Sequence, residues 1–207
     1  MIKAVIFDFG NVICSFERDT FINKIAKFSD KSVQELKKTI YSSDPLKYSS
    51  SPLKECESGR ISSEEFYRKI KKISNLSMPK EQFIKAHVYI FTPIRTTYDL
   101  IRKLKPNYKL ALLSNTDEWI FKYYISKISV FDLFDAVSAS FQVKEMKPGK
   151  KIFMDALRKL KVRPEECIYI DDIKEFAEVA NKIGMHGIHY TSHKKLIDSL
   201  RKLNVKI

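Results

Sequence analysis

The chain of 207 residues has only three cysteines, Cys14, Cys56 and Cys167, and they show no CxxC spacing. Their odd number and wide separation argue against a disulfide framework and a zinc site, and fit a reducing compartment. The chain also lacks an apolar run of the ~20 residues that a membrane span requires. Its first residues contain neither the h-region nor the small-residue cleavage site of a signal peptide. We therefore expect a cytoplasmic protein without a membrane partner.

The balance of charge is unusual, because 38 Lys and Arg residues against 25 Asp and Glu residues give a formal net charge of +13. A basic chain attracts anions, and nucleic acid is the first candidate. The lysines, however, are spread over helix faces opposite apolar stripes, and no stretch combines a basic run with interleaved aromatic side chains. We expect no nucleic-acid partner and interpret the charge as a solvated surface that attracts a small anionic substrate. The sequence indicates no oligomeric state.

Residues 16–93 follow a helical pattern in which no strand is evident. Capping-box signatures at Ser32–Glu35 and Ser62–Glu65 each predict a helix start. Pro79 is typical of a first helical turn. A polar stretch rich in Ser and Pro, at residues 41–52, predicts a loop between the helices.

Short apolar runs alternate with amphipathic helices in the rest of the chain. The expected strands are Lys3–Phe7, Lys109–Leu113, Ala136–Ala139, Cys167–Ile170 and Gly187–Tyr190; the expected helices are Asp117–Ser126, Gly149–Leu160, Ile173–Ile183 and one after Ser192. This alternation is typical of a parallel sheet with helices on both faces. The sequence thus predicts an α/β fold with a Rossmann-like core at residues 1–15 and 94–207. A helical cap at residues 16–93 is inserted after the first strand.

Polar side chains stand where the predicted strands end. In chain order they are Asp8, Ser114-Asn115 and Asp171-Asp172, and Lys147 lies in a loop before a predicted helix. Ligands of open parallel sheets bind in the crevice at the carboxyl ends of the strands. A pair of carboxylates that closes an apolar strand is costly to bury without a cation. These residues therefore predict a ligand site at one edge of the sheet.

Four segments resemble, in residue type and order, the motifs of the haloacid dehalogenase superfamily: VIFDFGNV, LLSNT, EMKPGKKIF and IYIDD. The helical segment after the first strand is similar to the helical cap of that superfamily, so the resemblance spans essentially the whole chain. FDFGNV together with LLSNT looks closest to its glucose-1-phosphate phosphatase-like branch. The resemblance implies a Mg²⁺-dependent phosphatase that acts on a small phosphorylated metabolite, with a sugar phosphate as one candidate.

The resemblance also implies a role for each motif residue. Asp8 would be the nucleophile that carries the phosphoryl group, and Lys147 would neutralise charge on the phosphoryl oxygens. Ser114, Asn115 and Gly10 would bind phosphate through the Ser hydroxyl and backbone N–H groups. The implied Mg²⁺ ligands are Asp8, the Gly10 carbonyl and Asp172, with Asp171 behind them. Phe16, Phe21 and Tyr67 are candidates to line the groove between cap and core.

Gly10 departs from the usual phosphatase motif, which has a second Asp at this position. That Asp serves as general acid for the leaving group and then as general base for water, and such a group contributes a rate factor of about 10²–10⁴. Two interpretations are open. Either the substrates have good leaving groups, as anomeric, acyl and aryl phosphates do, or another residue replaces the acid. Glu17 and Asp117 are the candidates near the motif loops.

Two other functions remain open at this point. A 2-haloacid dehalogenase of the same superfamily also lacks the second Asp, but it needs no metal, and Asp171-Asp172 favours one. Its first motif ordinarily has Tyr-Gly-Thr where this chain has Gly-Asn-Val. The second alternative is a catalytically weak phosphate-binding or regulatory protein that has kept the pocket and lost the acid.

Overall fold

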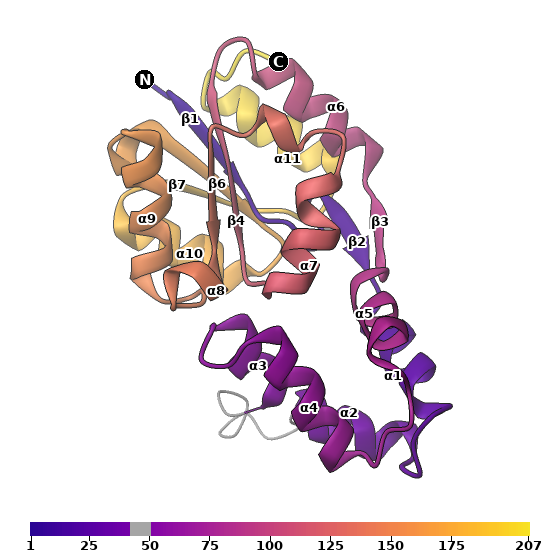
Figure 1. Cartoon of the computed structure of the whole chain (residues 1–207). Coiled ribbons are helices and arrows are strands. Elements are labelled where there is room, and N and C mark those ends of the chain that lie inside the picture. Colours follow the sequence, from indigo (N-terminus) through magenta and orange to yellow (C-terminus); the bar gives the residue numbers. More distant parts are fainter. Residues whose placement is uncertain (42–50) are drawn as a thin grey trace.

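The computed structural model describes residues 1–41 and 51–207. Its centre is a parallel sheet of five strands in the order β5-β4-β1-β6-β7 (Figure 1). The strands are β1 (Ala4–Phe7), β4 (Lys109–Ser114), β5 (Ala136–Ala139), β6 (Cys167–Asp171) and β7 (His186–His189). All neighbouring strands in this sheet pair in parallel. The predicted α/β fold is confirmed.

Helices cover both faces of the sheet. The side chains of β1 point alternately to the two faces and are apolar on both, so each face needs a layer of helices to bury it. Val5 and Phe7 belong to one apolar cluster, and Ala4 and Ile6 belong to the other. The first face carries α6 (Arg95–Leu104), α7 (Glu118–Tyr123) and α11 (His193–Lys202); the second carries α8 (Ser140–Val143), α9 (Lys150–Leu160) and α10 (Lys174–Ile183). Short 3₁₀ turns are η2 (Ile125–Lys127), η3 (Phe131–Leu133) and η4 (Pro164–Glu166). Burial on both faces explains why the strands read as unbroken apolar runs.

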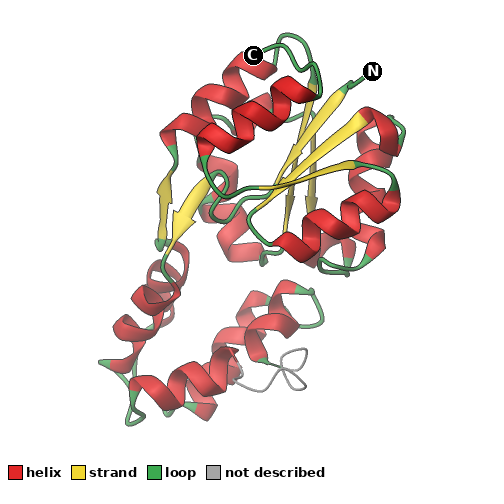
Figure 2. Cartoon of the chain, turned by 180° about the vertical axis from the view of Figure 1, so that it is seen from behind, coloured by secondary structure: helices red, strands yellow, loops and turns green. Residues whose placement is uncertain are grey.

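A group of helices stands apart from the sheet at its carboxyl edge (Figure 2). These insertion helices are α1 (Arg18–Ala26), α2 (Val33–Tyr41), α3 (Pro52–Glu57), α4 (Ser63–Ile73) and α5 (Lys80–Val88). Both predicted capping boxes form, with Ser32 N donating to Glu35 at 2.8 Å and Ser62 N donating to Glu65 at 2.8 Å. Pro79 occupies the N-cap position of α5, one residue before the predicted place. Residues 42–50 of the predicted loop lie outside the described residues.

A two-stranded antiparallel ribbon connects the insertion helices to the sheet region. It pairs β2 (Cys14–Phe16) with β3 (Phe91–Pro93). The expectation that residues 16–93 contain no strand is therefore wrong. Three-residue strands whose partners lie far away in sequence leave no local periodicity to detect. The predicted domain boundaries at residues 16 and 93 fall at this ribbon and stay predictions.

Strand ends differ from the predicted ones by one residue, and the difference matters for the site. β4 extends to Ser114 and β6 extends to Asp171, so both polar residues belong to the sheet itself. β7 begins one residue early, at His186. Among the described residues, no helix has the length and apolar character needed to cross a membrane.

Candidate active site

The order of the strands gathers the motif residues around Asp8. β1 lies between β4 and β6, with Phe7 opposite both Leu112 and Ile170. Asp8 follows directly, and its backbone N–H donates to the Ile170 carbonyl at 2.9 Å. Since parallel strands end at the same edge, the final residues of β4 and β6 flank Asp8. The sheet therefore brings Ser114 and Asp171 to either side of it.

Lys147 reaches the same point from the loop between α8 and α9. Its Nζ lies 2.5 Å from Asp8 Oδ1 and 2.7 Å from Asp171 Oδ2, and both ion pairs are buried. The Tyr169 hydroxyl also donates to Asp171 Oδ2. One ammonium thus bridges the ends of two neighbouring strands.

The Asn115 side chain holds the backbone of Lys147. Asn115 Oδ1 accepts from the Lys147 N–H at 2.8 Å, and Asn115 Nδ2 donates to the Lys147 carbonyl at 3.2 Å. The peptide bond from Lys147 to Pro148 is cis. The predicted phosphate-binding residue therefore uses its side chain to fix the lysine loop, which leaves its backbone N–H as the group that can face a phosphate.

Three carboxylates form a compact acidic group that fits a divalent cation. One oxygen each from Asp8, Asp171 and Asp172 lies within 4.8 Å of the others. Asn11 Nδ2 donates to Asp172 Oδ2 at 2.9 Å, and the Ile173 N–H donates to Asp171 Oδ1 at 2.8 Å. Carboxylate oxygens with room for several waters are what Mg²⁺ requires. The donor set matches the predicted metal and includes all three predicted side-chain ligands.

The pKa values of this group reflect buried charge that is only partly compensated. Burial raises the pKa of Asp8 to about 7, the charge of Lys147 acts to lower it, and the charge of Asp171 raises it further. Burial and the charge of Asp171 also raise the pKa of Asp172, although the hydrogen bond from Asn11 opposes them. Burial lowers the pKa of Lys147, but the charges of Asp8 and Asp171 outweigh this effect and raise it. Lys147 is therefore a fixed cation, and the carboxylates together favour a further positive charge.

Phe16 occupies the space beside Gly10 where the usual second carboxylate would begin. A Cβ atom built on Gly10 would lie 2.8 Å from Cε1 and 3.3 Å from Cδ1 of the Phe16 ring. The first distance is shorter than van der Waals contact, so no side chain fits at residue 10 unless the ring moves. The ring in turn packs against Phe91 of β3, with centroids 5.7 Å apart. An apolar ring thus faces the place of the missing acid.

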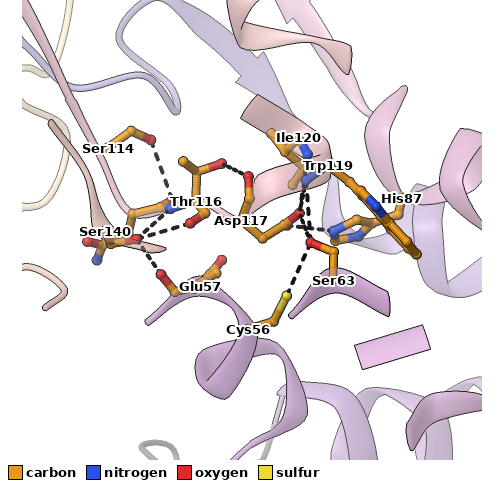
Figure 3. A network of polar contacts seen from close by, with 11 residues as sticks. Cys56, Glu57, Ser63, His87, Ser114, Thr116, Asp117, Trp119, Ile120 and Ser140 are labelled. Carbon is orange, nitrogen blue, oxygen red and sulfur yellow. Dashed lines mark hydrogen bonds and ion pairs between the residues drawn. The ribbon is translucent and has the colours of Figure 1, made fainter. Parts of the chain in front are cut away.

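Asp117 is one of the two residues proposed to replace that acid, and its hydrogen bonds make it unsuitable. It is fully buried, and its carboxylate caps α7 by accepting from the N–H groups of Trp119 and Ile120 at 2.9 and 3.2 Å. Ser63 donates to its Oδ1 at 3.2 Å, and His87 Nε2 lies 2.7 Å from its Oδ2 (Figure 3).

The balance of these contacts keeps Asp117 ionised. Burial raises the pKa of Asp117, but the charge of His87 and the hydrogen bonds from His87, Ile120 and Trp119 outweigh burial and lower it. The other candidate, Glu17, is exposed and does not line the cavity described below. Neither residue replaces the acid in this arrangement. Asp117 instead joins the sheet region to α4 and α5.

A cavity of about 690 Å³ lies between the carboxyl edge of the sheet and the insertion helices. Its sheet side includes Asp8, Gly10, Asn11, Ser114, Asn115, Lys147 and Asp172, and its other side includes Phe16, Arg18, Phe21, Tyr41, Leu53 and His87. Phe16 and Phe21 line the cavity, as predicted. Tyr67 does not, because it is buried inside the helical group and donates to the Met78 carbonyl at 3.1 Å.

All seven motif residues predicted from the sequence meet at this cavity or directly behind it. The sequence reasoning missed Asn11, Tyr169 and Arg18. Asn11 has a positive φ of 54°, a conformation that Asn adopts more readily than most residues, and its place after Gly10 was an available signal. Tyr169 lies two residues before Asp171 in the same strand, β6, so their place on one side of that strand was an available signal. Arg18 contacts rings on β2 and α2, and no local pattern marks it.

Known proteins resemble this chain in both sequence and structure. The haloacid dehalogenase-like hydrolase family matches residues 5–189. D-ribitol-5-phosphate phosphatase of Bacteroides thetaiotaomicron is 26% identical over 195 residues, which cover 89% of each chain. A protein described as a predicted HAD-like family hydrolase from Porphyromonas gingivalis has a TM-score of 0.82 at 25% identity, with 100% of both chains covered.

A solved structure with ligands has a similar fold. A HAD family enzyme of Bacteroides thetaiotaomicron, in complex with magnesium and inorganic phosphate, has a TM-score of 0.75 at 23% identity, covering 94% of this chain and 99% of that one. The predicted family is confirmed. The closer resemblance to the glucose-1-phosphate phosphatase-like branch stays a prediction.

Proposed function

Because the chain belongs to the haloacid dehalogenase-like hydrolase family, we propose that it is a Mg²⁺-dependent phosphatase with Asp8 as its nucleophile. The observation that carries the proposal is the meeting of three carboxylates and one ammonium at the carboxyl edge of the sheet. A cation held by Asp8, Asp171, Asp172 and the Gly10 carbonyl would neutralise the carboxylates and polarise the phosphoryl group. The phosphatase name of the 26% identical relative supports the same reaction class.

The reaction divides into two steps on Asp8. A carboxylate oxygen of Asp8 attacks phosphorus, and the bond from phosphorus to the leaving-group oxygen breaks with its electron pair going to that oxygen. Water then attacks phosphorus of the aspartyl phosphate, and the bond from phosphorus to the Asp8 oxygen breaks with its electron pair returning to the carboxylate. Inorganic phosphate is released, and the proton of the water passes to solvent. Lys147 stabilises the charge on the phosphoryl oxygens in both steps, with the Ser114 hydroxyl and the Asn115 N–H as donors.

The surroundings of Gly10 favour substrates whose leaving group needs no proton. Phe16 is apolar, and the buried Asp117 is engaged by four hydrogen bonds. We therefore propose anomeric, acyl or aryl phosphates of small metabolites as the substrate class, with sugar phosphates among them. The similar phosphatase from Bacteroides thetaiotaomicron is named for a phosphorylated sugar alcohol. That name supports a small phosphorylated metabolite without identifying it.

The test is phosphate release from a panel of sugar, acyl and aryl phosphates with Mg²⁺ or with EDTA. The expected result is turnover that needs both Mg²⁺ and Asp8, so that EDTA and Asp8→Asn each abolish it. Among aryl phosphates, kcat/KM should fall steeply as the phenol becomes less acidic. If no ester is hydrolysed while phosphate still binds, the chain is a phosphate-binding protein. Halide release from a 2-haloacid without metal would instead identify a dehalogenase.

A further inference from the structure

Arg18 places a positive charge on the cavity wall beyond Phe16. It is the first residue of α1, and its guanidinium carbon lies 5.5 Å from the centre of the Phe16 ring and 5.8 Å from that of the Tyr41 ring. The Tyr41 hydroxyl also donates to the Arg18 carbonyl at 3.2 Å. A guanidinium on aromatic faces is held by cation–π attraction and keeps its N–H groups free to donate. Two rings therefore hold this arginine at the cavity.

The charge of Arg18 has no carboxylate partner among residues 1–41 and 51–207. The adjacent Asp19 pairs with Lys37 at 2.8 Å instead. On the same side of the cavity, Lys54 and Glu57 pair with each other at 3.0 Å, so their charges compensate. An arginine that lines a cavity without an internal counter-ion is a donor set for an anionic group of a ligand.

That anionic group is distinct from the phosphoryl group that reacts. The cation beside the nucleophile is already supplied by Lys147, which contacts Asp8 directly. The Phe16 ring lies against Gly10 in the nucleophile loop, and the same ring holds Arg18. A general acid at residue 10 would have met the leaving group on this side of the cavity. Arg18 therefore lies on the leaving-group side of Asp8. A substrate that extends from Asp8 in this direction brings its leaving group to Arg18.

We propose that Arg18 selects substrates whose leaving group carries a negative charge of its own, a carboxylate or a second phosphate. Arg18 donates to that group, while Phe16 and Tyr41 hold the guanidinium in place. The inference rests on the proposed phosphatase function and adds the substrate class. It also gives the insertion-helix side of the cavity a role in binding the leaving group. There, the contact between Arg18 and the negatively charged leaving group takes the place of the contact that a general acid would make.

The test compares substrates that differ only in this charge. Phenyl phosphate and 3-carboxyphenyl phosphate have phenols of similar acidity, so chemistry contributes little to their ratio of kcat/KM. A second pair, an anomeric sugar phosphate and the corresponding bisphosphate, distinguishes a preference for a second phosphate from one for a carboxylate. For wild type, the charged member of at least one pair should be preferred by about tenfold, mainly through KM.

Three variants connect the preference to Arg18. Arg18→Met retains an apolar side chain on the two rings and should reduce the preference to a ratio of about one, and Arg18→Lys should keep part of it. Arg68→Met removes an exposed arginine of α4 that does not line the cavity, and it should keep the wild-type ratio. Equal kcat/KM within both pairs for wild type would overturn the inference. So would a preference that survives in Arg18→Met.

These outcomes differ from failure of the proposed function. If Asp8-dependent release of phosphate is absent for all four substrates, the phosphatase proposal itself fails. If hydrolysis of all four substrates depends on Mg²⁺ and Asp8 but shows no charge preference, the phosphatase proposal stands and Arg18 is not a specificity residue.

Discussion

The two sides of the cavity are built from different kinds of side chain. At the carboxyl edge of the sheet, charged groups converge: Lys147 contacts Asp8 and Asp171, and all three are nearly inaccessible to solvent. The insertion helices instead pack an aromatic cluster behind the cavity-lining Phe21, in which the centroid of the Phe83 ring lies 5.3 Å from that of Phe21 and 5.8 Å from that of Phe66. The sheet edge is thus suited to one fixed charge distribution. The helical side is suited to the shape and charge of the rest of a ligand.

The difference also concerns what holds each side in place. The charged group at the sheet edge depends on pairing, because an unpaired charge at that depth is costly. The aromatic cluster depends instead on burial and on edge-to-face contacts between rings. Asp117 connects the two, since it lies on the sheet side and contacts Ser63 of α4 and His87 of α5.

The largest expected effect comes from removing the cation that pairs with both Asp8 and Asp171 at the sheet edge. Lys147→Met leaves Asp8 and Asp171 buried without their counter-ion. We expect turnover to fall by about 10³-fold and the free energy of unfolding without metal to fall by about 3–5 kcal/mol. Phosphate release and urea unfolding measure the two effects. Lys151→Met, an exposed lysine of α9, is the control. Retention of more than a tenth of wild-type activity in Lys147→Met would refute this account of the sheet edge.

The next effect comes from restoring the missing acid. Gly10→Asp alone should gain nothing, because its Cβ would lie 2.8 Å from the Phe16 ring. Gly10→Asp combined with Phe16→Ala removes the obstruction, and kcat/KM for alkyl phosphates should rise by about 10²-fold relative to Phe16→Ala. The dependence of the rate on leaving-group acidity should flatten as well. A gain in the single Gly10→Asp variant would show that Phe16 does not occupy the place of the acid.

A smaller effect is expected at the contact between the two sides. Asp117→Ala removes the partner of His87 and the N-cap of α7, and should lower the free energy of unfolding by about 3 kcal/mol. Asp117→Asn keeps a cap acceptor and should cost less. Ser63→Ala removes the hydrogen bond to Asp117 at 3.2 Å and two longer contacts, from the Trp119 N–H at 3.4 Å and with Cys56 Sγ at 3.6 Å. Because the Asp117 contacts with His87 and the α7 N–H groups remain, it should cost about 1 kcal/mol. Denaturant unfolding measures all three variants, and an Asp117→Ala protein as stable as Ser63→Ala would contradict the role of Asp117.

The smallest expected effect is the loss of stability at low pH when Glu166, which precedes β6, becomes protonated. A hydrogen bond from Lys3, helped by contacts from Arg163, lowers the pKa of Glu166 from 4.5 to about 2. A carboxyl group with a lowered pKa stabilises the fold above its unfolded pKa, and this contribution is lost as the pH falls from about 4.5 to about 2. Glu166→Gln should therefore be less stable than wild type near pH 6 and approach it near pH 2. Melting temperatures at the two pH values measure this, and a constant difference would contradict it.

The sheet and its motif residues could be predicted because each depends on a local pattern. Strands buried on both faces read as apolar runs, and the residues that end them follow directly in the sequence. The ribbon of β2 and β3 was missed because its three-residue strands pair Cys14 with Pro93 and leave no periodicity. The absence of an acid at Gly10 was visible in the sequence, but the Phe16 ring beside it was not.

The contacts of Asp117 and Arg18 depend in the same way on the tertiary fold. Asp117 was a candidate acid from its position near a motif, and only the packing of α4 and α5 against it shows that its oxygens are engaged. Arg18 has no signal in the sequence beyond its charge, in a chain with 38 Lys and Arg residues. Its two aromatic neighbours come from different elements.

The central claim is that Asp8 carries the phosphoryl group, and the intermediate tests it directly. With no carboxylate at residue 10 to activate water, the aspartyl phosphate should persist long enough to be trapped by rapid acid quenching during turnover of an aryl phosphate with Mg²⁺. Mass spectrometry of the digested protein should then find one phosphoryl group on the peptide that contains Asp8, and none in Asp8→Asn. Phosphate release at the wild-type rate by Asp8→Asn, or a phosphoryl group on another residue such as Ser114, would contradict the account.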